Sequence, residues 1–137
     1  MGAWSHESFG NDDACDWAGQ LAQEDDFSLI ESTLDTVLST GDDYLEAPEA
    51  CEAIAAAEVL ARAQGNFGLR DAYSEDVDAW VERVNEKPSA ALIAKACQAL
   101  DRILTDPSEL MELWNESEDG EPWRTTVIAL KTRVSGA

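Results

Sequence analysis

Hydrophobic residues recur along most of this chain at intervals of three and four positions, which is the spacing of one face of an α-helix. The alternating pattern of a half-buried strand is not sustained anywhere in the sequence. The chain is therefore predicted to be all-α, a single compact bundle of about six or seven helices. The expected helices begin near Asn11, Asp26, Pro48, Ser74, Ser89, Asp106 and Pro122.

A length of 137 residues fits a single helical domain over 1–137. Two segments interrupt the helical pattern, an N-terminal loop over 1–10 and a mid-chain loop over 65–74. The helix before the mid-chain loop is the richest in Ala, so we expect it to be central, where small side chains let neighbours approach closely. The clearest helix start lies near residue 106, where we expect Asp106 to cap the helix and Glu109 to reach back in a capping box.

The charge of the chain is strongly negative, with 29 acidic residues against nine Lys and Arg and a net charge of −20. Fifteen of the acids lie in residues 1–61, which contain no Lys or Arg. Phosphate backbones and anionic membranes repel such a surface, so we expect neither direct nucleic-acid binding nor membrane binding. A basic protein surface would be attracted instead. Solubility, or adaptation to a salt-rich cytoplasm, is the alternative explanation of the acidity.

The first residues carry a motif at fixed spacing that resembles the signature of a bacterial family, domain of unknown function 4259. That signature reads Trp-Gly-x-Gly-x-Phe-x-Asn-Asp-x-Ala-x-Asp-Trp, and Ser5 and Glu7 replace its two glycines here. The resemblance implies a small, mostly helical bacterial domain with a structural N-terminal motif, and it implies no known activity. The matching residues are Trp4, Phe9, Asn11, Asp12, Ala14, Asp16 and Trp17.

The carboxylates of this motif have two interpretations. Asp12, Asp13 and Asp16 are three and four positions apart, and carboxylates at this spacing can hold Mg²⁺. In the structural interpretation, Asn11 caps a helix, the first acids match the helix dipole, and Asp16 accepts a hydrogen bond from the preceding loop or from a Trp N–H. We find no catalytic motif and expect no cofactor and no metal, but a metal-dependent enzyme that uses the N-terminal Asp cluster stays open.

Other residues with possible chemistry are predicted to be structural. Glu58 lies inside the Ala-rich helix, and Arg62 follows four positions later, which favours a helical ion pair over a carboxylic acid with a raised pKa. The residues Cys15, Cys51 and Cys97 are expected to be buried, reduced thiols. The sequence shows no basic and then apolar leader and no stretch long enough to span a membrane, so we expect a cytoplasmic protein.

The leading functional hypothesis is a non-enzymatic, acidic protein of the immunity or inhibitor type, which neutralises a basic bacterial partner such as a toxin or a nuclease. A DNA-mimic protein that occupies a DNA-binding protein is an alternative. The acids without an evident structural task are the expected contacts, together with one tryptophan predicted to be partly exposed. This partner-binding set is Glu24, Asp25, Asp26, Asp42, Asp43, Glu46, Glu49, Glu52 and Trp114.

Overall fold

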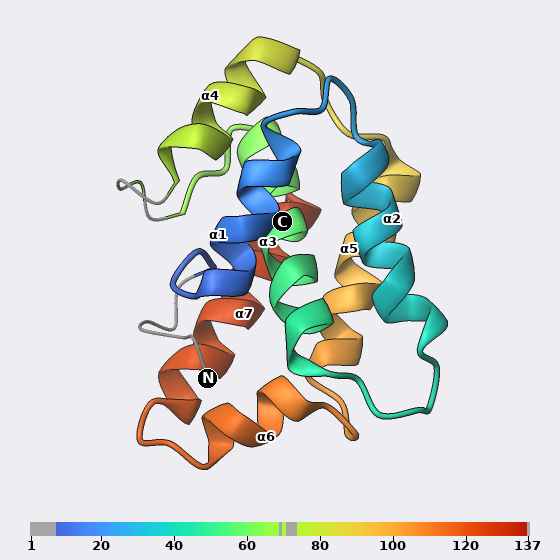
Figure 1. Cartoon of the computed structure of the whole chain (residues 1–137), viewed down its shortest axis with the longest axis vertical. Coiled ribbons are helices and arrows are strands. Elements are labelled where there is room, and N and C mark those ends of the chain that lie inside the picture. Colours follow the sequence, from blue (N-terminus) through green and yellow to red (C-terminus); the bar gives the residue numbers. More distant parts are fainter. Residues whose placement is uncertain (1–7, 69, 71–73, 137) are drawn as a thin grey trace.

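The computed structural model describes residues 8–68, 70 and 74–136, which form seven α-helices around one hydrophobic core (Figure 1). Within these residues there is no sheet, and the β-type pairing consists of one isolated bridge between Leu45 and Ser108. The prediction of an all-α bundle of six or seven helices is confirmed. The helices are α1 (Asp12–Leu21), α2 (Ser28–Ser39), α3 (Ala47–Ala63), α4 (Glu75–Val84), α5 (Ala90–Ile103), α6 (Glu109–Asn115) and α7 (Gly120–Ser135).

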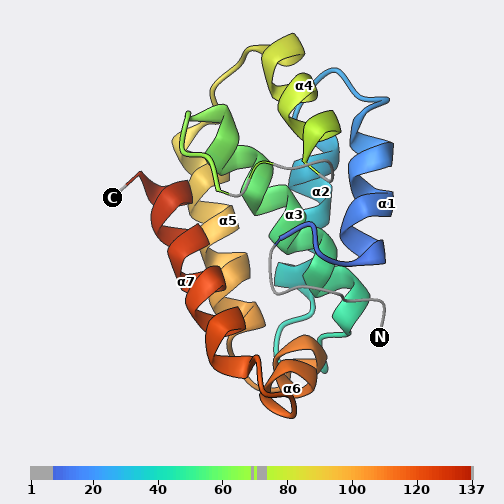
Figure 2. The same ribbon diagram turned by 90° about the vertical axis from the view of Figure 1, so that its left-hand side faces the viewer.

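The Ala-rich α3 is the central helix, as its composition predicts. Its alanines at 53, 55, 56, 57 and 61 are completely buried. Because small side chains let helix axes approach closely, α3 packs against each of the other six helices of the described chain. In Figure 2, α3 runs with α5 and α7 on one side and α1 and α2 on the other. The helices α4 and α6 cover its two ends (Figure 1).

The start of α6 differs from the sequence prediction. Ser108 is the N-cap, since its hydroxyl accepts the backbone N–H three residues on at 3.4 Å. The carboxylate of Glu109 accepts the N–H of Ala47 at 2.7 Å, in the first turn of α3, instead of reaching back within its own helix. The expectation that Asp106 caps this helix and that Glu109 completes a capping box is therefore wrong. The Glu109 carboxylate binds a free N–H at the start of α3, so it is not available to cap its own helix, α6.

The α3 helix ends at a glycine, as predicted. Gly65 has a φ of 85°, a left-handed conformation that glycine adopts without steric strain. The next helix starts near Ser74 as expected, but the Ser74 hydroxyl donates to the carboxylate of Asp78 at 3.3 Å and makes no capping hydrogen bond. The final helix begins at Gly120, two residues before the predicted Pro122. These differences concern helix ends and leave the predicted order of the helices unchanged.

Candidate functional site

The N-terminal motif starts α1 as predicted. The side-chain oxygen Oδ1 of Asn11 accepts the N–H of Ala14 at 2.8 Å, so the predicted cap is confirmed. Asp12 and Asp13 are exposed in the first turn, at the positive end of the helix dipole, and Asp16 is exposed one turn later. None of these three carboxylates has an ion pair within the described residues. The cap thus needs only the amide and leaves the carboxylates facing solvent.

The aromatic residues of the motif lie in the core. Trp17 is 1% exposed, and its indole N–H donates to the hydroxyl of Thr33 on α2 at 2.9 Å. The indole N–H of Trp17 is therefore not the one that Asp16 was expected to accept, and the expected bond to the preceding loop or to another Trp stays a prediction. Phe9 is buried, and its ring centroid lies 5.8 Å from the guanidinium carbon of an α3 arginine. Trp4, the first residue of the predicted motif, lies outside the described residues.

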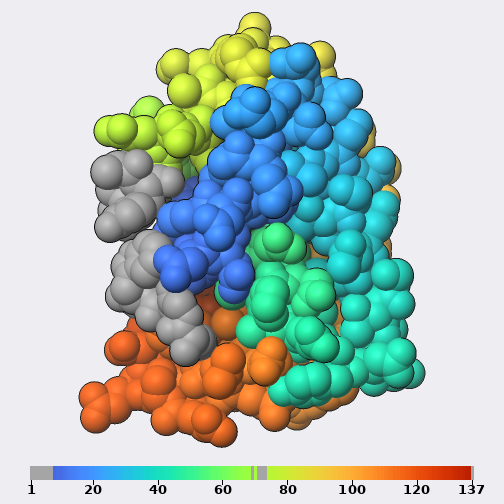
Figure 3. Space-filling view, viewed as in Figure 1, coloured from blue at the N-terminus to red at the C-terminus, as the bar shows by residue number. Residues whose placement is uncertain are grey.

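The start of α1, dark blue in Figure 3, lies beside the green first part of α3, and the two helices are in contact. This contact gathers carboxylates. Partial burial, and then the nearby carboxylates of Asp13 and Glu49, raise the pKa of Glu52. Burial followed by the charges of Asp13 and Glu52 raises the pKa of the Cys51 thiol to about 12. The Oε2 atom of Glu49 is buried and has no hydrogen-bond partner among the residues that the structure describes. We define the acidic face as Asp12, Asp13, Asp16, Glu49 and Glu52.

The predicted contact acids at 24–26 have structural tasks in the connection from α1 to α2. The carboxylate of Asp25 accepts from Arg83 at 2.6 Å, and that of Asp26 accepts the N–H of Ser28 at 2.9 Å. The backbone carbonyl oxygen of Glu24 accepts the indole N–H of Trp80, on α4, at 2.8 Å. The interpretation that these acids lack a structural task is therefore wrong for the carboxylates of Asp25 and Asp26, whereas Glu24 contributes here through its backbone and its carboxylate stays a predicted contact. They start α2 and hold the connection against α4.

The connection from α2 to α3 exposes the next group of predicted contact acids. Asp42, Asp43 and Glu46 are exposed and have no ion pair in the part of the chain that the structure describes. The guanidinium of Arg102 binds this connection through backbone carbonyl oxygens, that of Gly41 at 2.8 Å and that of Asp43 at 2.7 Å. The arginine therefore fixes the backbone of the connection and leaves its carboxylates free.

Tyr44 lies within this acidic connection and was not among the predicted contacts. Its side chain is 50% exposed. Partial desolvation, followed by the carboxylates of Glu112, Glu109 and Glu46, raises the pKa of the Tyr44 hydroxyl. An aromatic residue inside the run of acids at 42–46 was the signal available in the sequence. Glu109 and Glu112 of α6 come close to Tyr44 only in the folded chain, so their positions in the sequence could not assign them to this group.

Trp114 lies in the core. It is only 7% exposed, and its ring stacks on that of Trp123, with centroids 6.3 Å apart and planes inclined by 7°. The stack joins α6 to α7, two helices that follow each other in the chain. The prediction that Trp114 is partly exposed is therefore wrong, because its large apolar ring system completes the core at this end of the bundle. Its assignment to a partner-binding surface stays a prediction.

A buried ionic network joins α3, α4 and α7. Glu58 is 3% exposed and accepts hydrogen bonds from the Ser8 hydroxyl at 2.9 Å, Arg62 at 3.1 Å and Arg133 at 2.6 and 2.8 Å. Arg62 also reaches Asp78 at 2.7 Å. Burial alone would raise the pKa of Glu58, but Arg133, then Arg62 and Ser8, lower it below its usual range. The predicted ion pair is confirmed, and the alternative of a raised-pKa acid is wrong.

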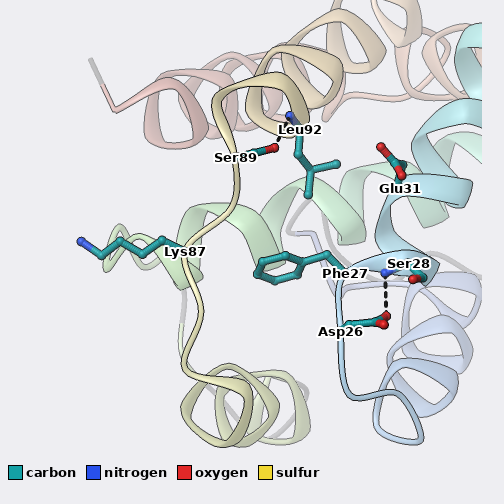
Figure 4. Close-up of a pocket in the computed structure, with 7 residues that line it drawn as sticks. All are labelled: Asp26, Phe27, Ser28, Glu31, Lys87, Ser89 and Leu92. Carbon is teal, nitrogen blue, oxygen red and sulfur yellow. Dashed lines mark hydrogen bonds between the residues drawn. The ribbon is translucent and has the colours of Figure 1, made fainter.

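An open pocket of about 380 Å³ lies between the starts of α2 and α5 (Figure 4). Its polar groups already serve the helix starts. Asp26 accepts the N–H of Ser28, and the Ser89 hydroxyl accepts the N–H of Leu92 at 3.1 Å. Figure 4 shows the Lys87 side chain directed away from the pocket. These groups therefore explain the local structure and do not define a binding site of their own.

Over residues 8–68, 70 and 74–136, no group of three or more His, Cys, Asp or Glu side chains is arranged to hold a metal ion. In the same residues, no helix is both long enough and apolar enough to cross a bilayer. The three cysteines are free thiols, Cys51 buried and Cys15 and Cys97 partly buried. The acidic face is distinguished by its charge, and none of its five carboxylates has an ion pair in the described part of the chain.

The fold and the acidic face define a small all-α domain with an acid-rich surface formed largely by its first half. The chain belongs to the family described as Domain of unknown function (DUF4259), whose family model matches residues 2–126. The membership in this family that the N-terminal motif suggested is thus confirmed by a match over most of the chain. Comparisons with curated proteins and with solved structures give no match.

Proposed function

We propose that this protein is a non-enzymatic acidic protein-binding domain of the immunity or inhibitor type, which neutralises a basic bacterial partner such as a toxin or a nuclease. Its own cations support this proposal because most of them are engaged elsewhere. Arg62 and Arg133 bind Glu58, and Arg102 binds backbone carbonyls. The acids at 12, 13, 16 and 42–46 therefore face solvent without a counter-ion among the described residues, with Glu49 and Glu52 of the acidic face partly buried, and a basic surface would be attracted to them.

The observation that carries the proposal is the grouping of Asp13, Glu49 and Glu52 at the contact of α1 with α3. The raised pKa of Glu52 means that the fold works against its ionised form. A buried polar atom without a hydrogen bond, such as Oε2 of Glu49, adds a further energetic penalty. A Lys or Arg from a partner would stabilise the ionised form of Glu52 and would give Oε2 of Glu49 a hydrogen-bond donor. Both changes would contribute to the free energy of binding.

The test is affinity capture from cells of the source organism at low salt, using two variants that each remove three negative charges. The wild type and the control variant should retain a basic protein and release it as salt rises, whereas the face variant should not. Equal capture by all three proteins, or recovery of no basic protein by the wild type, would contradict the proposal. The face variant is D13N/E49Q/E52Q, and the control variant, on exposed positions of α4, is E75Q/D76N/E82Q.

The three free thiols fit a reducing compartment, so we place this function in the cytoplasm. The DNA-mimic alternative would use the same acids but a different partner, and double-stranded DNA would then compete for the captured protein. No observation on the described residues favours DNA mimicry or a metal-dependent enzyme over the leading proposal. For a partner that does not itself bind DNA, the competition experiment distinguishes the inhibitor from the mimic, because a mimic requires a DNA-binding surface on its partner.

A further inference from the structure

We infer that Tyr44 is an anchor that receives an arginine side chain of the basic partner; this inference rests on the proposed function and specifies where the partner docks. Tyr44 is 50% exposed, on the connection between α2 and α3. The bridge between Leu45 and Ser108 and the bond of Glu109 to the Ala47 N–H bring the start of α6 to this connection, so the carboxylates of Glu46, Glu109 and Glu112 lie close enough to act on the hydroxyl of Tyr44. The position thus offers an accessible aromatic ring beside negative charge, a combination that suits a cation with a flat face.

Elsewhere in the protein, an arginine lies over an exposed aromatic ring and next to a carboxylate, which is the arrangement proposed for Tyr44 with its partner. Three large hydrophobic side chains are exposed in the described part of the chain, namely Tyr44, Phe67 and Ile128. The ring of Phe67 already carries the guanidinium of Arg70 at 4.4 Å from its centroid, and Arg70 in turn lies 3.4 Å from a carboxylate oxygen of Asp78. Tyr44 has the ring and the carboxylates, and no described guanidinium lies over it.

The chemistry favours arginine over lysine at this position. A guanidinium is planar, so it can stack on an aromatic ring while its N–H groups bind carboxylate oxygens in a bidentate manner. A lysine ammonium is a compact charge that keeps its water more strongly and cannot stack in this way. Tyrosine and arginine are also enriched among the residues that carry most of the energy of protein interfaces.

The backbone around Tyr44 is held in place before any partner arrives. Arg102 binds the carbonyl oxygens of Gly41 and Asp43, on either side of the first acid of the connection. The Glu109 carboxylate binds the N–H of Ala47, the first residue of α3, at the end of the connection. An anchor on a fixed backbone loses less conformational entropy on binding than one on a free loop, which makes this ring suitable for recognition.

The test uses fluorescein-labelled octa-arginine and octa-lysine peptides, whose binding is measured by fluorescence anisotropy at low salt. Tyr44→Leu should weaken octa-arginine binding about two- to fivefold, the range of an exposed cation–π contact, and should change octa-lysine binding less. Tyr44→Phe keeps the ring and should bind as the wild type does. Ile128→Ala removes an equally exposed hydrophobic side chain from α7 and is the matched control. Circular dichroism checks that each variant is folded.

Three outcomes would overturn the anchor. Tyr44→Leu could bind octa-arginine as tightly as the wild type, it could lose both peptides equally, or Ile128→Ala could weaken binding as much. If the variant D13N/E49Q/E52Q loses the peptides while Tyr44→Leu keeps them, the anchor fails and the proposed acidic binding surface stands. If the wild type binds neither peptide at low salt, the anchor fails together with the electrostatic basis of the proposed function.

Discussion

Replacing Glu58 with Gln should reveal how strongly the buried ionic network stabilises the bundle. The substitution preserves the size of the side chain but removes the charge that faces Arg62 and Arg133. Arg62 is 2% exposed and would keep Asp78 as a partner, while the side chain of Arg133 is 23% exposed and can reach water. Breaking a buried pair costs about 3–5 kcal/mol, and the remaining contacts place this variant near the lower value, about 3 kcal/mol.

The assay is urea unfolding followed by far-ultraviolet circular dichroism, because urea does not screen charges. The control is Glu31→Gln, which breaks an exposed pair with Lys95, whose side chains are 56% and 28% exposed. That change should cost less than about 1 kcal/mol. A loss of about 3 kcal/mol corresponds to a drop in Tm of roughly 10 °C for a chain of this size. If Glu58→Gln costs no more than Glu31→Gln, the network is not the stabilising element described above.

Three further results are expected. Since the pKa of Glu58 is held below its usual value of 4.5, the network contributes fully above that pH and is lost as pH falls through the folded-state pKa. The stability difference between wild type and Glu58→Gln should therefore shrink in acid, and a constant difference down to pH 2 would contradict this. Because the pKa of Glu52 is raised, Glu52→Gln should stabilise the protein at neutral pH by about 0.3 kcal/mol. This gain should disappear as pH falls through the folded-state pKa of Glu52. A loss of stability at pH 7 would argue against repulsion between Glu52 and the carboxylates of Asp13 and Glu49. Trp114→Ala should cost about 3 kcal/mol in urea unfolding and leave partner capture by the folded protein intact, whereas loss of capture without loss of stability would restore Trp114 as a contact.

The features that the sequence predicted well are those that neighbouring residues determine. The helical spacing, the Asn11 cap and the pair of Glu58 with Arg62 all depend on positions within four residues of each other. The central place of α3 followed from its alanines, because small side chains suit a helix with neighbours on all sides. Local patterns therefore sufficed for the fold class and for the identity of the most buried acid.

The features that the sequence missed depend on contacts between distant residues. Arg133 reaches Glu58 across 75 positions, and Glu109 reaches the N–H of Ala47 across 62. The exposure of Trp114 was misjudged because its partner is on another helix. The acids of the candidate site were affected in the same way. Asp13 was assigned to starting a helix and Glu49 to a separate patch, whereas the packing of α1 on α3 brings them together.

The central claim is that the acidic face binds a basic partner, and the dissociation constant of the purified partner tests it most directly. Binding should be measured by calorimetry for the wild type, D13N/E49Q/E52Q and E75Q/D76N/E82Q at several salt concentrations. We predict that the wild type and the control variant bind alike and weaken together as salt rises. The face variant should bind at least about tenfold more weakly at low salt and depend less on salt. The same dissociation constant and the same salt dependence for all three proteins would contradict the account.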